Sequence, residues 1–242
     1  DTPTQVATLA NRLQAAAYGI ELPADRALDP MPIAPWPPNG YERLDAKAGT
    51  QPINIPLLMG VAQLGDGMPG TALRRGFTPL PSQMAIGATW TPDLAQRTGE
   101  VVGRELNTVG INLLLGPSLD VFQQANPMAV SGLSISTFGG SSYWVSVLGR
   151  AYIAGVHDGG QNRVATVTGH FPGQGSTDRP PEEQVATIQQ SLDEMRRGPL
   201  LPFVATTRSP SSVTVSGGDA GAAEAIGGQP SRAPSLRRPF RS

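Results

Sequence analysis

The sequence predicts an α/β fold in which parallel strands form part of a TIM-type (β/α) barrel and helices cover the outside. Short runs of apolar and β-branched residues alternate along the chain with longer segments whose apolar residues recur at helical spacing. Glycine and proline number 29 and 24 among 242 residues, which is too many for a helical bundle and typical of strand-to-helix loops. We identify only about five strands, whereas closure needs eight. A partial barrel is therefore expected.

Residues 1–54 are expected to form a helix followed by a proline-rich covering segment. Apolar residues at helical spacing predict a helix from Thr4 to Tyr18, with Gly19 as its stop. Six prolines between positions 23 and 38 exclude regular structure there.

Residues 55–205 are expected to contain the strands and helices of the barrel. The apolar run Pro56 to Ala62 predicts a buried strand. The segment Thr91 to Asp93 combines a cap residue, a proline for the first helical position and an acid suited to the helix dipole. It predicts the start of a helix that Gly110 ends.

The remaining elements continue the alternation of strand and helix. Further strands are predicted at Ile111 to Leu115, Val164 to Val167 and Leu200 to Val204. Further helices are predicted from Ser142 and from Pro180, the latter continuing through Ile188, Leu192 and Met195 to Arg196 and Arg197.

Residues 206–242 differ in composition from the rest of the chain. They consist mostly of Ser, Gly, Ala, Pro and Arg and offer few large apolar side chains. Such a segment cannot bury enough surface to offset its ordering entropy. It is predicted to be a disordered tail.

Composition argues against several classes of partner and site. The formal net charge is −1 and no Lys/Arg-rich block occurs, so a nucleic-acid partner is not expected. No apolar run reaches the roughly 20 residues of a membrane span. With no cysteine and two histidines, neither a metal site nor a bound cofactor is expected. A chain starting at Asp1 without methionine is compatible with an extracytoplasmic or secreted protein.

The segment Val164 to Asp178 brings a histidine, a Pro-Gly turn and an aspartate to the end of a predicted buried strand. Polar groups in this position usually mark a functional site. Within it, Gly169-His-Phe-Pro-Gly-Gln-Gly175 resembles the Lys-His-Phe-Pro-Gly-His-Gly signature of glycoside hydrolase family 3. Further blocks resemble the same family in the same order, at Pro56 to Gln63, Gly76 to Gly87, Gly110 to Val121 and Thr137 to Gly140.

The resemblance covers roughly Ile55 to Phe203 and implies the N-terminal barrel domain of this family, truncated in this chain. Its members cleave β-linked glucose or N-acetylglucosamine, and retaining glycosidases use a carboxylate nucleophile and a general acid/base. The resemblance implies a nucleophilic aspartate on a late strand, beyond the matched region. Neither Asp219 nor Glu224 lies in a strand-like context.

Several site residues follow from the resemblance. Asp120 and His170 match substrate-binding positions, and Gln174 replaces the second histidine of the signature as a neutral donor and acceptor. Asp178 corresponds to the aspartate of the Asp-x-His acid/base loop, whose histidine is replaced by Pro180.

Structural roles for these residues stay open. Asp120 can be a turn or capping aspartate, His170 a core histidine and Asp178 a helix N-cap. At three further positions a substrate-binding residue of the family is replaced, and these are Ala62 for aspartate, Ser136 for arginine and Gly169 for lysine. Each replacement removes hydrogen bonds to sugar hydroxyls.

Two main functions are consistent with this pattern. The first is a retaining β-glucosidase or β-N-acetylhexosaminidase of this family with impaired activity. The alternative is a non-catalytic carbohydrate-binding relative or degenerate fragment that associates with a partner or with a second copy covering the open barrel edge. A purely structural subunit is a third class.

Overall fold

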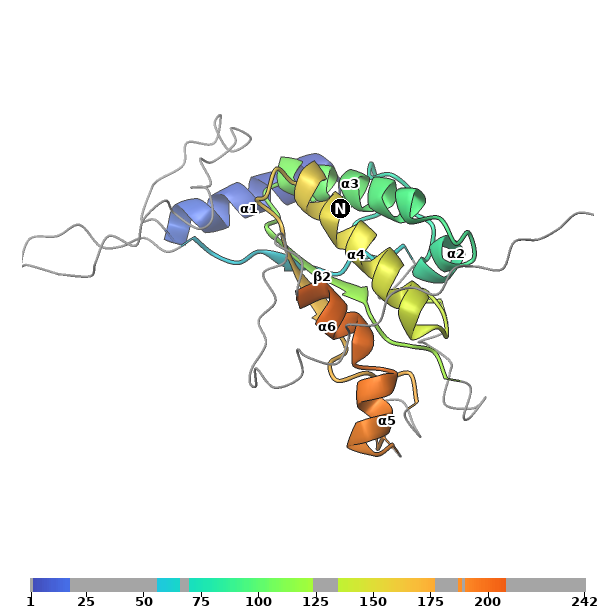
Figure 1. The fold of residues 1–242 in the computed structure, drawn as a ribbon. Coiled ribbons are helices and arrows are strands. Elements are labelled where there is room, and N and C mark those ends of the chain that lie inside the picture. The colour runs from blue at the N-terminus through green and yellow to red at the C-terminus, as the bar shows by residue number, and fades with distance from the viewer. Residues whose placement is uncertain are drawn as a thin grey trace, which may run out of the picture.

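The computed structural model of the chain describes residues 2–17, 56–65, 70–123, 135–176, 187–188 and 190–207. Their elements are, in order, α1 (Pro3–Ala17), β1 (Gly60–Val61), α2 (Gln83–Gly87), α3 (Pro92–Thr108), β2 (Leu113–Ser118), α4 (Ser142–Gly159), β3 (Ala165–Gly169), α5 (Leu192–Arg197) and α6 (Leu201–Thr207) (Figure 1). The predicted covering segment, the acid/base loop and the tail lie outside these residues, apart from the last two residues of α6. The domain boundaries therefore stay predictions.

The sheet is parallel with strand order β1-β2-β3. Leu113 is in register with Gly60 on one side and with Ala165 on the other. The long helices α3 and α4 pack side by side over the face that carries the fully buried Leu114. This confirms the predicted partial barrel, in which parallel strands alternate with outer helices.

Glycines allow the backbones of α3 and α4 to approach closely. A Cβ added at Gly99 would lie 2.1 Å from the Tyr152 carbonyl oxygen, and one at Gly155 would lie 2.0 Å from that of Gln96. Such separations are far below van der Waals contact, so only glycine fits at these positions. Gly103 and Gly159 are equally restricted along the same contact.

The predicted start of α3 is confirmed. Pro92 occupies the first turn together with Asp93, and Thr91 is the N-cap. The Thr91 hydroxyl, however, donates to the Thr89 carbonyl at 2.9 Å instead of capping the helix. Beyond the helix end Gly110 adopts a φ of +78°, which favours glycine and turns the chain toward β2.

The strand predicted over Pro56 to Ala62 is wrong except at Gly60–Val61. The backbone N–H and carbonyl of Leu57 bond to the side-chain amide of Gln14, at 3.0 and 2.9 Å. Asn112 Oδ1 accepts from the Met59 N–H at 2.7 Å. Side-chain amides thus take the place of strand partners, and Leu58 is left 70% exposed. The apolar character of the run is a local property, whereas its pairing as a strand depends on Gln14 and Asn112, which are distant in sequence.

The long helix predicted from Pro180 is also wrong, because Thr187 and Ile188 are not helical and α5 begins only at Leu192. Ser191 and Glu194 form a capping box: the Ser191 hydroxyl accepts from the Glu194 N–H, and the Glu194 carboxylate accepts from the Ser191 N–H at 2.8 Å. These bonds lower the pKa of Glu194. A helix-start signal therefore lay within the segment predicted to be continuous.

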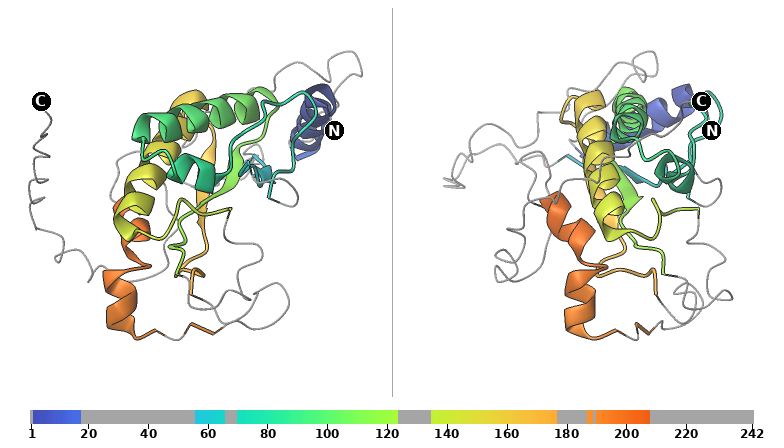
Figure 2. Two further views of the ribbon diagram at one scale, coloured as in Figure 1. Left: turned by 90° about the vertical axis from the view of Figure 1, so that its right-hand side faces the viewer. Right: turned by 45° about the vertical axis from the view of Figure 1, so that its right-hand side comes forward.

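The strand predicted at Leu200 to Val204 is instead helix α6, which packs against α4. Phe203 is buried and meets the Phe171 ring edge-on at 5.5 Å. A short apolar run has the same composition in a buried strand and a buried helix, so periodicity alone cannot separate them. Figure 2 shows α5 (orange) at the end of the molecule opposite α1 (blue), with α6 between α5 and α4. Among the described helices none has the length and apolar character needed to cross a membrane.

Candidate functional site

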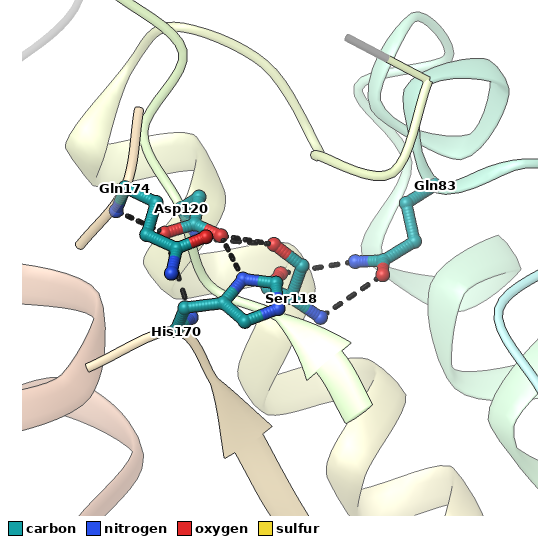
Figure 3. Close-up of polar contacts among 5 residues, drawn as sticks. All are labelled: Gln83, Ser118, Asp120, His170 and Gln174. Atoms are coloured by element: carbon teal, nitrogen blue, oxygen red, sulfur yellow. Dashed lines mark hydrogen bonds and ion pairs between the residues drawn. The ribbon is translucent and has the colours of Figure 1, made fainter. Parts of the chain in front are cut away.

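A buried carboxylate lies where β2 ends. Asp120 follows Ser118, the last residue of β2, and its side chain is fully buried. Oδ2 accepts from the Ser118 hydroxyl at 2.9 Å, and Oδ1 accepts from the Gln174 N–H at 2.6 Å (Figure 3). Each carboxylate oxygen thus has a donor, which compensates for the cost of burying the group.

The neighbouring strand brings a histidine to the same carboxylate. His170 directly follows β3, and its Nδ1 lies 2.7 Å from Oδ2 of Asp120 (Figure 3). The His170 backbone N–H also points at Oδ1, at 3.4 Å. Asp120 therefore holds both ends of the loop from His170 to Gln174, and it orients the imidazole ring.

The ends of β2 and β3 are themselves fixed by buried polar contacts. The amide of Gln83 on α2 donates to the Ser118 carbonyl and accepts from the Ser118 N–H, both at 3.0 Å. The Leu119 N–H donates to the Gly169 carbonyl at 2.6 Å. These bonds connect the short helix and the two strands immediately below the Asp120 carboxylate.

The His170 side chain is 50% exposed, whereas that of Asp120 is 0% exposed. Because the carboxylate accepts the proton on Nδ1, the Nε2 atom is an acceptor in the neutral ring and a donor in the protonated ring. A half-exposed imidazole whose Nδ1 is held by a buried carboxylate is suited to form a hydrogen bond with a hydroxyl-bearing ligand. The exposed Phe171 ring lies next to it in the chain.

The structure brings together three of the four predicted site residues. Asp120 bonds both His170 and Gln174, while Asp178 lies outside the described residues. The two interpretations of Asp120, as a turn residue and as a site residue, describe the same set of bonds. The roles of Asp120, His170 and Gln174 toward a ligand stay predictions.

Sequence reasoning missed Ser118 and Gln83. A polar residue at the end of an apolar strand was the available signal for Ser118. Nothing in the local sequence indicates that Gln83 is buried, because its partner lies 35 residues away.

The three substituted positions bring no charge to the site. Ala62 takes part in backbone bonding to Ala72, and Ser136 is partly buried. Around Gly169 a Cβ would meet nothing within 4 Å, so space exists for a larger side chain. Within the described ranges no group of three or more His, Asp or Glu side chains could hold a metal ion.

A cavity of about 550 Å³ occurs in another part of the fold. It is lined by Gly65, Thr71, Leu73, Arg74, Arg75, Thr78, Pro79 and Leu80, a set that does not include Asp120, His170 or Gln174. The polar cluster at the strand ends is therefore a separate feature.

Known proteins are similar to this chain in sequence and in fold. The family model for the glycosyl hydrolase family 3 N terminal domain matches residues 41–217, which extends beyond the region identified from the motifs. A beta-hexosaminidase of Pseudomonas aeruginosa is 31% identical over 157 residues, covering 64% of this chain and 45% of the relative. A beta-N-acetylglucosaminidase/beta-glucosidase of Cellulomonas fimi is 30% identical over 58% of this chain and 23% of its own length.

A solved structure supports the same relationship. The glycoside hydrolase family 3 beta-N-acetylglucosaminidase from Paenibacillus sp. str. FPU-7 superposes with a TM-score of 0.63 at 29% identity, covering 85% of this chain and 32% of that protein. This chain spans less than half the length of the Pseudomonas, Cellulomonas and Paenibacillus relatives. By the family match, the ordered motifs and the partial barrel, the chain belongs to glycoside hydrolase family 3, and the match falls on the N-terminal domain of that family.

Proposed function

We propose that this chain binds a β-linked glucoside or N-acetylglucosaminide at the strand ends, with Asp120, His170 and Gln174 as the ligand-binding group. The observation that carries the proposal is the His170 ring, whose Nδ1 is fixed by a buried carboxylate while the side chain is 50% exposed. Hydroxyl groups of a sugar both donate and accept hydrogen bonds, and Nε2 can do either according to its protonation. The names of the hexosaminidase and glucosidase relatives favour the same ligands.

Hydrolysis by a retaining mechanism is the activity proposed for the lineage, at a reduced level in this chain. Retaining glycosidases need two carboxyl groups about 5–5.5 Å apart. Asp178 is the proposed acid/base, whereas the nucleophile is missing from the matched region, which is why activity is proposed to be impaired; Asp219 and Glu224 become candidates only if the C-terminal residues complete the barrel. Replacement of charged residues by Ala62, Ser136 and Gly169 weakens binding of the transition state, because charged hydrogen bonds contribute about 1.5–3 kcal/mol each.

Nitrophenyl β-glucoside and nitrophenyl β-N-acetylglucosaminide test both parts of the proposal. We expect slow release of nitrophenol above a buffer blank, abolished by His170→Ala or Asp178→Ala. Arg196→Ala on the exposed face of α5 is the matched control, since Arg196 has only a 3.7 Å ion pair with Asp193.

Calorimetry with N-acetylglucosamine and glucose separates binding from turnover. Binding without turnover in the parent, lost in His170→Ala, supports the non-catalytic alternative. If the parent neither binds nor hydrolyses these sugars, the assignment of His170 as a ligand-binding residue is wrong.

A second proposal, association through the open sheet, is favoured by one specific observation. Leu115 of β2 and Val167 of β3 are in register and are 46% and 47% exposed, on the face opposite the helices. A parallel strand edge next to an exposed apolar face favours pairing with another chain. Light scattering should show a dimer or larger species for the parent and a smaller one for Leu115→Thr with Val167→Thr. An unchanged mass for both proteins would remove this proposal.

A further inference from the structure

Three aromatic side chains gather where α3 and α4 begin. The Trp144 ring meets Trp90 edge-on at 5.0 Å and Tyr143 edge-on at 5.5 Å. Trp144 packs partly against the core, whereas Trp90 is 55% and Tyr143 is 67% exposed. One anchored ring thus supports two rings that face outward.

The backbone at Trp90 adopts a φ of +53°, in the left-handed region that only glycine, asparagine and aspartate visit readily. A bulky residue there is unfavourable for the folded chain, and an indole ring that stays 55% exposed recovers little hydrophobic free energy in return. Burial explains neither feature. Residues held in such conformations occur preferentially at binding sites.

The loops around this aromatic cluster carry no formal charge. Residues 76–92 and the described residues 135–149 contain no Asp, Glu, Lys or Arg, and the first charged side chain after residue 92 is Asp93 in the first turn of α3. They supply instead Ser, Thr and Gln side chains in addition to the indole N–H and phenol O–H groups. A surface of this chemistry suits a neutral, hydroxyl-rich ligand and offers little to a polyanion.

The aromatic cluster also lies at the same edge of the sheet as Asp120. Phe122, two residues beyond Asp120, donates its N–H to the Gly139 carbonyl at 3.0 Å, just before α4. In Figure 1 the arrowhead of β2 and the first turns of α3 and α4 lie on the same side. The strand ends and the start of α4, which carries Trp144, therefore lie at the same edge of the sheet.

We propose that Trp90, Tyr143 and Trp144 form a docking surface for a neutral β-linked oligosaccharide whose terminal sugar lies at His170. Sugar rings present apolar C–H faces bordered by hydroxyl groups, which match exposed aromatic rings with polar edges. The inference rests on the proposed sugar site and specifies its substrate class, since a chain that reaches this surface is longer than a monosaccharide.

Binding of a β-1,4-linked N-acetylglucosamine hexasaccharide and of the monosaccharide to the full chain tests the inference. Tryptophan fluorescence and calorimetry should show the hexasaccharide binding at least about tenfold more tightly. Trp90→Asn and Tyr143→Ala should remove this difference and leave monosaccharide affinity unchanged. Asn accepts the left-handed backbone, so Trp90→Asn should keep or raise the melting temperature. Loss of binding in that variant would then not reflect unfolding.

The two proposals fail in different ways. Equal affinity of hexasaccharide and monosaccharide in the parent overturns the docking surface and leaves the sugar site standing. Hexasaccharide binding that Trp90→Asn abolishes and His170→Ala does not affect supports the aromatic surface alone, and it overturns both the sugar site and the placement of the terminal sugar at His170. If Trp90→Asn changes only the oligomeric mass, the aromatic cluster is a protein interface and the inference is wrong. Leu192→Ala, which also truncates an exposed apolar side chain, should alter none of these readouts.

Discussion

The imidazole Nδ1 of His170 lies 2.7 Å from Oδ2 of Asp120. The two residues follow the carboxyl ends of β3 and β2, which are neighbouring parallel strands. Asp120 is inaccessible, whereas half of the His170 side chain is accessible. The carboxylate therefore positions both the ring and the loop, whereas half of the His170 side chain is in contact with solvent. The two residues should respond differently to substitution.

Asp120→Asn should lower the free energy of unfolding by about 2–4 kcal/mol, because it weakens charge-assisted bonds to two backbone N–H groups and to the imidazole. His170→Ala should lower it by less than about 1 kcal/mol, since half of that side chain is already in water. Urea unfolding of both variants provides the comparison. Equal destabilisation would mean that the ring, like the carboxylate, serves to hold the loop.

Restoring charged side chains should recover affinity for sugar. The triple variant Ala62→Asp, Ser136→Arg, Gly169→Lys is expected to bind glucose or N-acetylglucosamine more tightly by a few kcal/mol, at about 1.5–3 kcal/mol for each charged hydrogen bond. The open space around Gly169 accommodates the lysine. Calorimetry on the triple variant and on Gly169→Lys alone gives the result. No gain in affinity for either sugar would show that positions 62, 136 and 169 do not face the proposed sugar site.

Gln83→Leu should destabilise the fold by about 2–4 kcal/mol, because the N–H and carbonyl of Ser118 would both lose their partner in a buried place. Gln96→Leu is the control: its amide makes one long exposed contact, at 3.4 Å to Asp158, and its loss should cost less than about 0.5 kcal/mol. Chemical denaturation measures both. A similar value for the two variants would contradict the importance of the bond to Ser118.

Thr137→Val should stabilise the protein by about 1 kcal/mol. The Thr137 hydroxyl oxygen is buried and has no hydrogen-bond partner within the described part of the chain, and valine has nearly the same shape without the polar atom. A rise in melting temperature is the expected readout. A fall would indicate that the hydroxyl has a bonding partner in solution.

Alkaline pH should destabilise the fold through Tyr152. Burial raises the pKa of this phenol above its ordinary value of 10.0. The unfolded chain therefore loses the proton first as pH rises past about 10, and stability falls by at most about 1.4 kcal/mol per pH unit. Tyr152→Phe should remove that part of the decline, as measured by unfolding at pH 9 to 11. An identical decline in the variant would assign the effect to other groups.

The sequence by itself determined those features whose signals are local. The start of α3 follows from Thr91, Pro92 and Asp93, because capping, a fixed φ and a favourable dipole interaction act within one turn. The order of strands and helices predicts a parallel sheet, and the carboxyl ends of such strands meet at one edge. The family resemblance assigned Asp120 and His170 to one site, and the structure shows the two side chains in contact.

Tertiary structure alone decided where buried backbone groups find their partners. The run at Leu57 to Met59 is apolar enough for a strand, yet its backbone bonds the amides of Gln14 and Asn112, 43 and 53 residues away. The run around Phe203 became α6 because a helix there packs against α4. The composition of a segment limits how much apolar surface it can bury. Which hydrogen-bonding partners reach it depends on chain segments that are distant in sequence, and folding alone brings these together.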